Sequence, residues 1–180
     1  MVYVCYDNEA YMNTGIQRSS STPRFADATT TPAGRVIPGK PQNKKDLTAI
    51  MAAHGIPYAA QTTFLGNFKD FHEKAEKAIY TEGPAFLNVM SPCPRGWRYE
   101  TEDIAEICRL AVDSCVWPLF EVKGGVWKLN YEPKKKLPVE DYLKKQGRFK
   151  HMFLPGSEWM IEETQKHVDE KWEALLAKCK

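Results

Sequence analysis

The sequence contains no apolar run long enough to cross a lipid bilayer, and its first residues lack the pattern of a signal peptide. Its formal net charge is only +2, which is too small to indicate a nucleic-acid or membrane partner. We therefore expect a soluble cytoplasmic protein with no nucleic-acid or membrane contacts. The 180 residues, 43% of them hydrophobic, are enough for one domain with a substantial core.

Paired cysteines are also missing. The number of cysteines is odd and no two of them form a Cys-x-x-Cys pair, which disfavours both a disulfide framework and a self-contained zinc or iron–sulfur site. A cysteine that binds a cluster would therefore need companions from outside this sequence. The five cysteines are Cys5, Cys93, Cys108, Cys115 and Cys179.

Strands alternate with amphipathic helices along the first two thirds of the sequence. Strands are predicted at residues 2–6, 58–63 and 85–90, and helices at 44–54, 68–80 and 100–115. This order predicts an α/β fold with a parallel sheet. The first strand is a continuous apolar run, so we expect it to be buried on both faces. Asn67 is expected to cap the second helix, which places Phe68 on its buried face and Lys74 on its solvated face. His54, at the end of the first helix, is expected to cap that helix rather than to act in catalysis.

The last third of the sequence has a different character. Two short strands around Gly124 and Gly125 predict a hairpin, followed by a lysine-rich linker, a short helix at 138–149 and an amphipathic helix at 156–180. We therefore divide the chain into residues 1–117, the α/β part, and residues 118–180, an extension expected to pack on a partner. The side chains available for that packing are Trp159, Ile161, Val168, Trp172, Leu175 and Leu176.

Short polar residues follow the first strand directly. Open α/β sheets bind ligands just beyond the carboxyl ends of their strands. Asn8 offers a side-chain oxygen there, and Ala10 offers a backbone carbonyl. Neutral oxygens of this kind suit a Mg²⁺ ion that holds a diphosphate. The alternative is an ordinary turn stabilised by Asx hydrogen bonds.

Cys93 occupies the equivalent place after the strand at 85–90. Pro92 and Pro94 flank it, so it lies in a stiff loop with few competing backbone donors. A single cysteine is usually a small buried apolar residue, and this remains the alternative. The spacing of Cys108 and Cys115 within a helical pattern predicts core positions for both.

These two segments resemble a known family. Residues 6–23, Tyr-Asp-Asn-Glu-Ala-Tyr-Met-Asn-Thr-Gly-Ile-Gln-Arg-Ser-Ser-Ser-Thr-Pro, resemble the second half of the thiamine-diphosphate motif of 2-oxoacid:ferredoxin oxidoreductases. The similarity is greatest to the beta subunits of the pyruvate synthases. Residues 91–97, Ser-Pro-Cys-Pro-Arg-Gly-Trp, and the later Gln-Gly-Arg-Phe segment also match that family.

The resemblance assigns roles to several residues. It implies that Asn8, through its side chain, and Ala10, through its carbonyl, bind Mg²⁺, and that Tyr11 belongs to the cofactor-binding turn. It implies that Asn13 lies beside the thiazolium carbon and the 2-oxoacid as a catalytic residue. Cys93 becomes the fourth thiolate of a [4Fe–4S] cluster. The hydroxyl-rich loop at 17–34, otherwise read as a flexible surface loop, becomes a candidate to contact phosphate or a partner subunit.

One element of the family pattern is missing. The family motif opens with Gly-Asp-Gly, whose aspartate binds Mg²⁺, and this triplet occurs nowhere in the sequence. We therefore expect a partial, Rossmann-like thiamine-diphosphate-binding domain that is inactive when isolated. A companion polypeptide, the remainder of the beta subunit, would supply Gly-Asp-Gly and three cysteines. Alpha-, gamma- and delta-type subunits and ferredoxin are the other partners that the resemblance implies.

The implied reaction is oxidative decarboxylation of pyruvate with coenzyme A to acetyl-CoA and CO₂, with electrons passing to ferredoxin through the cluster. Two alternatives stay open. The substrate could be another 2-oxoacid, such as oxalate, phenylglyoxylate or a branched 2-oxoacid. The chain could also be an inactive fragment. A flavodoxin-like binding module is disfavoured, because Asp7, Asn8 and Glu9 are too acidic for a phosphate loop.

Overall fold

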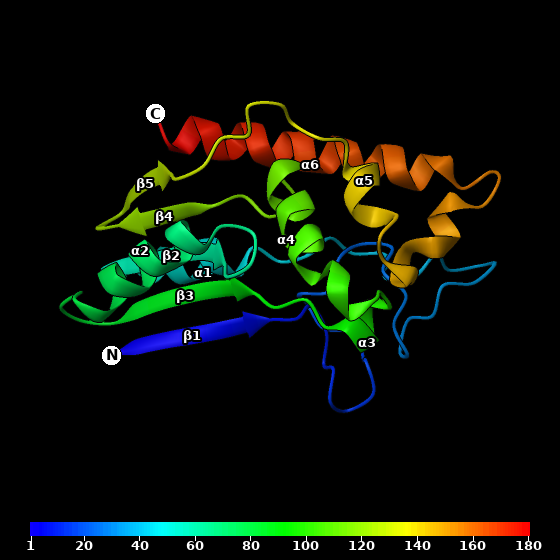
Figure 1. The fold of residues 1–180 in the computed structure, drawn as a ribbon, viewed down its shortest axis with the longest axis horizontal. Helices are drawn as coiled ribbons and strands as arrows, with labels where there is room; N and C mark the ends of the chain where they lie inside the picture. Colours follow the sequence, from blue (N-terminus) through cyan, green and yellow to red (C-terminus); the bar gives the residue numbers. More distant parts are fainter.

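The computed structural model describes all residues from 1 to 180 and contains one five-stranded sheet (Figure 1). The strand order is β1-β3-β2-β4-β5; the first three strands in this order are parallel, and β4 and β5 run antiparallel to their neighbours. This confirms the α/β class. The strands are β1 (Val2–Asp7), β2 (Tyr58–Thr63), β3 (Ala85–Met90), β4 (Phe120–Lys123) and β5 (Val126–Leu129).

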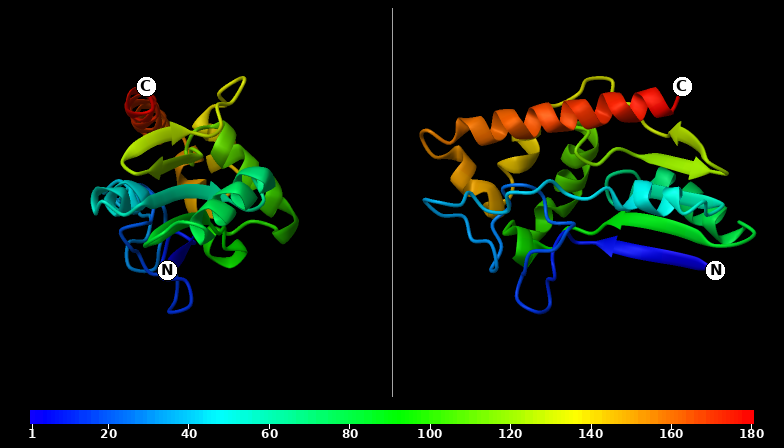
Figure 2. Two further views of the ribbon diagram at one scale, coloured as in Figure 1. Left: turned by 90° about the vertical axis from the view of Figure 1, so that its left-hand side faces the viewer. Right: turned by 180° about the vertical axis from the view of Figure 1, so that it is seen from behind.

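Helices pack on both sides of this sheet and beyond its carboxyl-terminal edge. α1 and α2 contact β2 and β3. α6 lies along β5, α5 and the 3₁₀ segment Gly147–Phe153 (Figures 1 and 2). The chain termini lie at opposite edges of the sheet. The helices are α1 (Leu47–Ala53), α2 (Phe68–Ile79), α3 (Pro94–Trp97), α4 (Ile104–Asp113), α5 (Val139–Leu143) and α6 (Glu158–Lys178), with 3₁₀ segments at Thr101–Asp103 and Gly147–Phe153.

The predicted hairpin is confirmed. β4 and β5 are joined by Gly124 and Gly125, whose φ angles of +55° and +82° are the left-handed values that a two-residue hairpin loop requires. β4 also pairs with β2, so the hairpin continues the main sheet. The sheet and the main core therefore run across residue 117, and the division of the chain at that residue stays a prediction.

The expected burial of β1 on both faces is wrong. β1 is an edge strand that pairs only with β3, and its exposed fractions are 62% at Tyr3 and 72% at Tyr6. Neither α1 nor α2 covers it, because both helices lie over β2 and β3. The apolar run that predicted a doubly covered strand is therefore left open in this chain.

The apolar face of α2 also differs from the prediction. Asn67 caps the helix as expected, its side chain accepting the backbone N–H of Asp70. Lys74, however, is buried and not solvated: its ammonium donates to the Gln61 carbonyl at 2.8 Å and pairs with the Asp70 carboxylate at 2.8 Å. Phe68, expected on the buried face, is 60% exposed. Lys74 is therefore an exception on a face that is otherwise exposed at Lys69, Glu73 and Glu76, while Ala78 lies in the core as predicted.

Burial lowers the pKa of Lys74 to about 8 from an ordinary value of 10.5. Between these pH values the unfolded chain keeps a proton that the folded chain has released, so this group makes stability rise with pH. The comparison is with an Asp70→Asn/Lys74→Met double variant, which lacks both charges. We expect the difference in free energy of unfolding, wild type minus variant, to rise by on the order of 3 kcal/mol from pH 8 to 10.5. Urea denaturation at several pH values measures it. A flat difference would show that Lys74 titrates normally.

The C-terminal helix packs on its own chain. Val168, Trp172 and Leu175, which the sequence offered for contacts with a neighbour, are buried in the main core. Trp159 remains 45% exposed and packs edge-to-face on Phe25. Docking of residues 118–180 on a partner stays a prediction. No helix of the structure is both long and apolar enough to span a membrane.

Candidate functional site

The two segments singled out in the sequence meet at one edge of the sheet. β1 and β3 are adjacent and parallel, with Asp7 in register with Met90, so the turn after β1 and the loop after β3 begin side by side. The loop after β3 contains Cys93 and continues into the short helix α3 (Figure 1). The carboxyl-terminal edge of the sheet is where the fold places ligands.

Two direct contacts join these segments. The indole N–H of Trp97, which is fully buried, donates to the backbone carbonyl of Asn8 at 2.9 Å. Gly96 allows the side chain of Met12 to come close, because a Cβ at residue 96 would lie 2.2 Å from the Met12 sulfur. The motif glycine and tryptophan therefore hold the Cys93 loop against the turn after β1.

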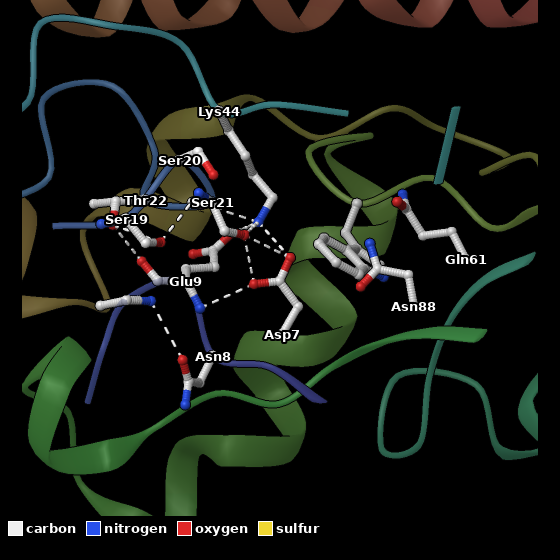
Figure 3. A network of polar contacts seen from close by, with 12 residues as sticks. Asp7, Asn8, Glu9, Ser19, Ser20, Ser21, Thr22, Lys44, Gln61 and Asn88 are labelled. Carbon is white, nitrogen blue, oxygen red and sulfur yellow. Dashed lines mark hydrogen bonds and ion pairs between the residues drawn. The ribbon is translucent and has the colours of Figure 1, made fainter. Parts of the chain in front are cut away.

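The turn after β1 has a fixed, strained backbone. The Asp7 carboxylate accepts the N–H of Glu9 at 3.0 Å, and the Asn8 side-chain oxygen accepts the N–H of Ala10 at 3.3 Å (Figure 3). Glu9 has a φ of +65°, an unfavourable value for a residue with a side chain. Such a backbone persists only where its surroundings over-determine it.

Buried ion pairs provide these surroundings. The Asp7 carboxylate accepts hydrogen bonds from the Ser21 hydroxyl at 2.6 and 2.7 Å and from the Lys44 ammonium at 2.6 Å (Figure 3). The Glu9 carboxylate, only 1% exposed, pairs with Arg148 at 2.6 Å and with Lys44 at 3.2 Å. Both carboxylates of the turn are thus already bound to cations of this chain.

Arg148 ties the C-terminal part of the chain to the site. Its guanidinium lies 3.8 Å above the Trp97 ring and donates to the Gln146 side chain at 2.7 and 2.9 Å. Burial is nearly complete for both Arg148 and Gln146. The sequence offered only the resemblance of the Gln-Gly-Arg-Phe segment as a signal, because Arg148 meets its partner Glu9 across 139 positions of the chain.

The hydroxyl-rich loop packs on the site and is not a free surface loop. The Lys40 ammonium donates to the backbone carbonyls of Ser20, Thr22 and Asn43, and burial lowers its pKa to about 8. Phe25 is only 2% exposed. The serines expected to face phosphate or a partner have contacts within the chain: Ser21 binds Asp7, and Ser19 binds Thr22.

Tyr11 and Asn13 lie on a protruding loop beyond the turn. Paired backbone hydrogen bonds between Tyr11 and Gln17, at 2.9 and 3.1 Å, close this loop. Both Tyr11 and Asn13 are exposed, and the Asn13 side chain has no hydrogen-bond partner in this chain. Its amide is therefore free to meet a ligand.

The oxygens at the turn fit part of a Mg²⁺ site. The Ala10 carbonyl accepts no hydrogen bond, and the Asn8 side-chain oxygen accepts only one of the two that it has room for. Nowhere in the chain do three or more His, Cys, Asp or Glu side chains gather as a metal site. Because an octahedral Mg²⁺ that holds a diphosphate usually also takes a carboxylate ligand, these two oxygens alone would not complete such a site.

Cys93 caps the N-terminus of α3, and its sulfur accepts the N–H of Gly96 at 3.4 Å. Hydrogen bonds of this kind to sulfur tune iron–sulfur clusters. Cys93 is half-buried, whereas Cys108 and Cys115 are buried in the main core as predicted. Cys93 is thus the cysteine that the site brings to the turn after β1. His54 ends α1 through a backbone hydrogen bond, as expected of a cap residue.

Comparison with known proteins supports the resemblance to thiamine-diphosphate enzymes. Residues 1–89 match the family described as thiamine pyrophosphate enzyme, C-terminal TPP binding domain. The chain is 50% identical over 175 residues to pyruvate synthase subunit PorB of Methanocaldococcus jannaschii, which covers 97% of this chain and 57% of that subunit. It is 49% identical to ketoisovalerate oxidoreductase subunit VorB of Pyrococcus furiosus, covering 97% of this chain and 55% of that one.

A solved 2-oxoglutarate:ferredoxin oxidoreductase from Magnetococcus marinus aligns with 62% of this chain and 42% of its own, at 30% identity and a TM-score of 0.46; so partial a superposition supports nothing further. The chain spans about half the length of the curated relatives it matches. The alignments with the PorB subunits cover 97% and 98% of this chain at 50% and 48% identity, which shows the family to which the chain belongs. The chain belongs to the family of 2-oxoacid:ferredoxin oxidoreductase beta subunits and corresponds to the C-terminal half of a PorB-type subunit.

Proposed function

We propose that this chain forms one half of the thiamine-diphosphate, Mg²⁺ and [4Fe–4S] site of a pyruvate:ferredoxin oxidoreductase. The enzyme would convert pyruvate and coenzyme A to acetyl-CoA and CO₂ and pass electrons to ferredoxin. The single observation that carries this proposal is the joining of the turn after β1 to the Cys93 loop through the hydrogen bond from Trp97 to the Asn8 carbonyl. A cofactor bound by the turn is then placed beside the thiolate that would hold the cluster.

Asn8 and Ala10 would bind the metal. The Asn8 side-chain oxygen and the Ala10 carbonyl are the oxygens of the turn with free acceptor capacity, and the Glu9 backbone fixes where each of them lies. The next residue, Tyr11, would line the cofactor. Thiamine diphosphate, when bound, supplies the carbanion-stabilising chemistry of the decarboxylation, and the protein supplies position and charge.

Asn13 would act on the substrate. Its side-chain amide is exposed and unpartnered on the loop closed by Tyr11 and Gln17. Such an amide can donate a hydrogen bond to an oxygen on which negative charge develops, which is the usual role of a preorganised donor in acyl chemistry. Since the loop is anchored at both ends by backbone hydrogen bonds, the donor is held at a defined distance from the turn.

The part of the beta subunit that this chain does not span would supply the remaining ligands. Both carboxylates of the turn are bound to cations of this chain, so the metal's carboxylate ligand must come from elsewhere. Cys93 likewise has no cysteine neighbours with which to form a cluster site, and three more thiolates are needed. The remainder of the beta subunit would bring both sets, alpha-, gamma- and delta-type subunits would complete the complex, and ferredoxin would accept the electrons.

A branched 2-oxoacid is the second candidate substrate. The chain is 50% identical to a pyruvate synthase subunit and 49% identical to a ketoisovalerate oxidoreductase subunit, which leaves the two substrates equal on similarity. Comparing kcat/KM for pyruvate and for 2-ketoisovalerate in the purified complex decides between them. A higher value for 2-ketoisovalerate would replace pyruvate in the proposal and leave the site unchanged.

The proposal is tested on the complex purified from the host cell through a tag on this chain. We expect Asn8→Ala to lose bound thiamine diphosphate and Mg²⁺, because the metal loses a side-chain ligand. Asn13→Ala should keep both and lower kcat by about 10²–10³-fold, as when a preorganised donor is removed. Thiamine and metal analysis together with 2-oxoacid-dependent reduction of ferredoxin measure these effects.

Asn43→Ala is the matched control, since Asn43 is exposed and the hydrogen bond of its side chain goes to His167, away from the turn after β1. Its cofactor content and rate should equal those of the wild type. A wild-type complex free of thiamine diphosphate would mean that the chain is an inactive fragment. Full cofactor content in Asn8→Ala would remove Asn8 from the metal site.

A further inference from the structure

A cavity of about 210 Å³ lies between α6, the sheet and the segment that leads into α1. The sheet contributes Gln61 of β2 and Asn88 of β3, which are in register with each other (Figure 3). Much of the wall is apolar and includes the buried side chains of Trp117, Phe120 and Trp172. Since an apolar cavity of about 150 Å³ accommodates benzene, this one has room for an aromatic ring with a small substituent.

The cavity is separate from the proposed cofactor site and from the open edge of the sheet. Its lining includes none of Asn8, Ala10, Asn13 and Cys93, and no residue of β1. Glu9 is the one residue of the turn after β1 that reaches the wall, and its carboxylate is already bound to two cations of this chain. A ligand in the cavity would therefore be distinct from the proposed cofactor.

Asn88 leaves one buried atom of the cavity wall without a partner. Its Nδ2 donates to the Thr48 hydroxyl at 3.2 Å, and that hydroxyl donates to the Gln61 side chain at 3.2 Å. The Asn88 Oδ1, in a residue that is only 1% exposed, accepts no hydrogen bond. Leaving a buried acceptor unpaired is unfavourable. The cavity therefore favours a ligand that carries an O–H or N–H group at its buried end.

The rim of the cavity carries free positive charge. Lys45, Lys171 and Lys178 line it, are exposed and form no ion pair within the chain. The two exposed acidic residues of the rim are already engaged, because Asp46 caps α1 and Glu163 pairs with an arginine. The rim therefore favours a ligand with a negatively charged group at its outer end.

Arg24 adds an unpaired donor to the lining. Its terminal nitrogen pairs with Glu163 at 2.8 Å, whereas its Nε, which is buried, has no hydrogen-bond partner. A carboxylate is the natural acceptor for a guanidinium N–H. The cavity thus combines an acceptor without a donor, an apolar wall, and a cationic donor without an acceptor.

We propose that this cavity binds a small aromatic carboxylate with a hydroxyl on its ring. The ring would lie against Trp117 and Trp172, as aromatic side chains favour. The hydroxyl would donate to the Asn88 Oδ1, and the carboxylate would lie at the rim with Arg24 and the free lysines. The inference goes beyond the proposed function and does not depend on it, because the residues that carry it are outside the proposed cofactor site.

Equilibrium dialysis of the full chain, purified with the partners that it retains, tests the inference with 4-hydroxybenzoate as the probe. We expect one site per chain with a Kd of about 0.1–1 mM, which is ordinary for a ligand of this size. Benzoate lacks the donor and phenol lacks the carboxylate, so each should bind about tenfold more weakly. High salt should weaken the binding of both acids and leave phenol unchanged.

Two variants locate the ligand. Asn88→Leu should weaken 4-hydroxybenzoate about tenfold and leave benzoate within about twofold, because only the hydroxyl loses its partner. Lys45→Gln/Lys171→Gln should weaken both acids by about threefold and leave phenol unchanged, as expected for exposed charges. Lys166→Gln is the matched control, since Lys166 is exposed on the same helix and outside the lining.

Thermal denaturation verifies that each variant is folded, and the three ligands on the wild type decide the question if Asn88→Leu is not. The inference is overturned if the wild type shows no saturable binding, or if it binds 4-hydroxybenzoate and benzoate equally. Displacement of the probe by pyruvate would place it in the substrate site instead. Binding that the lysine double variant leaves at the level of Lys166→Gln would likewise place the ligand outside this cavity.

Discussion

Replacing Arg148 with methionine is expected to lower the free energy of unfolding by about 3–5 kcal/mol, the effect of breaking a buried ion pair. The Glu9 carboxylate would stay 1% exposed and lose its 2.6 Å contact with the guanidinium. Methionine preserves most of the packing on Trp97, so the loss reports on charge rather than on a cavity. Urea denaturation of the chain at pH 7, followed by circular dichroism, measures the change.

The matched control is Arg98→Met. Arg98 pairs with Asp27, but its side chain is 41% exposed, and exposed pairs contribute less than about 1 kcal/mol. In a Glu9→Gln/Arg148→Met double variant no unpaired charge remains buried near Trp97, so part of the lost stability should return. If Arg148→Met proves as mild as Arg98→Met, the buried pair does not stabilise the fold.

The same variant links stability to the site. Glu9 holds a φ of +65° between Asn8 and Ala10, and the contacts with Arg148 and Lys44 are what fix its side chain. Without Arg148 the turn can relax to an ordinary backbone, which moves the two oxygens proposed to bind Mg²⁺. The C-terminal part of the chain therefore supports the candidate site, because its Arg148 holds Glu9 in the turn after β1.

Local signals in the sequence predicted most of the fold. Asn67 before an amphipathic run marked the start of α2, and two adjacent glycines, Gly124 and Gly125, marked the hairpin. These features depend on neighbouring residues alone. The sequence order of strands and helices likewise placed Asn8 and Cys93 at the same edge of a parallel sheet, which the structure confirms.

Features set by distant partners were not predictable in the same way. An apolar run shows that a strand can be buried but not which element covers it, and β1 is left open at Tyr3 and Tyr6. Helical periodicity placed Lys74 on the solvated face, because a lysine is normally exposed. Its burial depends on the ion pair with Asp70, which periodicity does not show. The pairing of Glu9 with Arg148 has no local signal at all.

Replacing Cys93 with alanine is expected to remove the proposed cluster. The iron and acid-labile sulfide of the purified complex should fall by the content of one [4Fe–4S] cluster. A [4Fe–4S] cluster needs four ligands, and alanine offers none. The ferredoxin-linked rate should fall to background with it. Thiamine diphosphate should remain bound, because Trp97 rather than Cys93 holds the Asn8 carbonyl. Iron, sulfide and thiamine analysis of one preparation separates these effects.

Cys179→Ala is the matched control for this experiment. Cys179 is also half-buried, but it ends α6 and lies outside the loop that meets the turn after β1. It should keep the cluster, the cofactor and the rate. A cluster retained in Cys93→Ala would assign the fourth ligand to another residue. Loss of the cluster together with thiamine diphosphate would instead mean that the Cys93 loop and the turn after β1 form a single cooperative unit, in which neither cofactor binds unless both segments are in place.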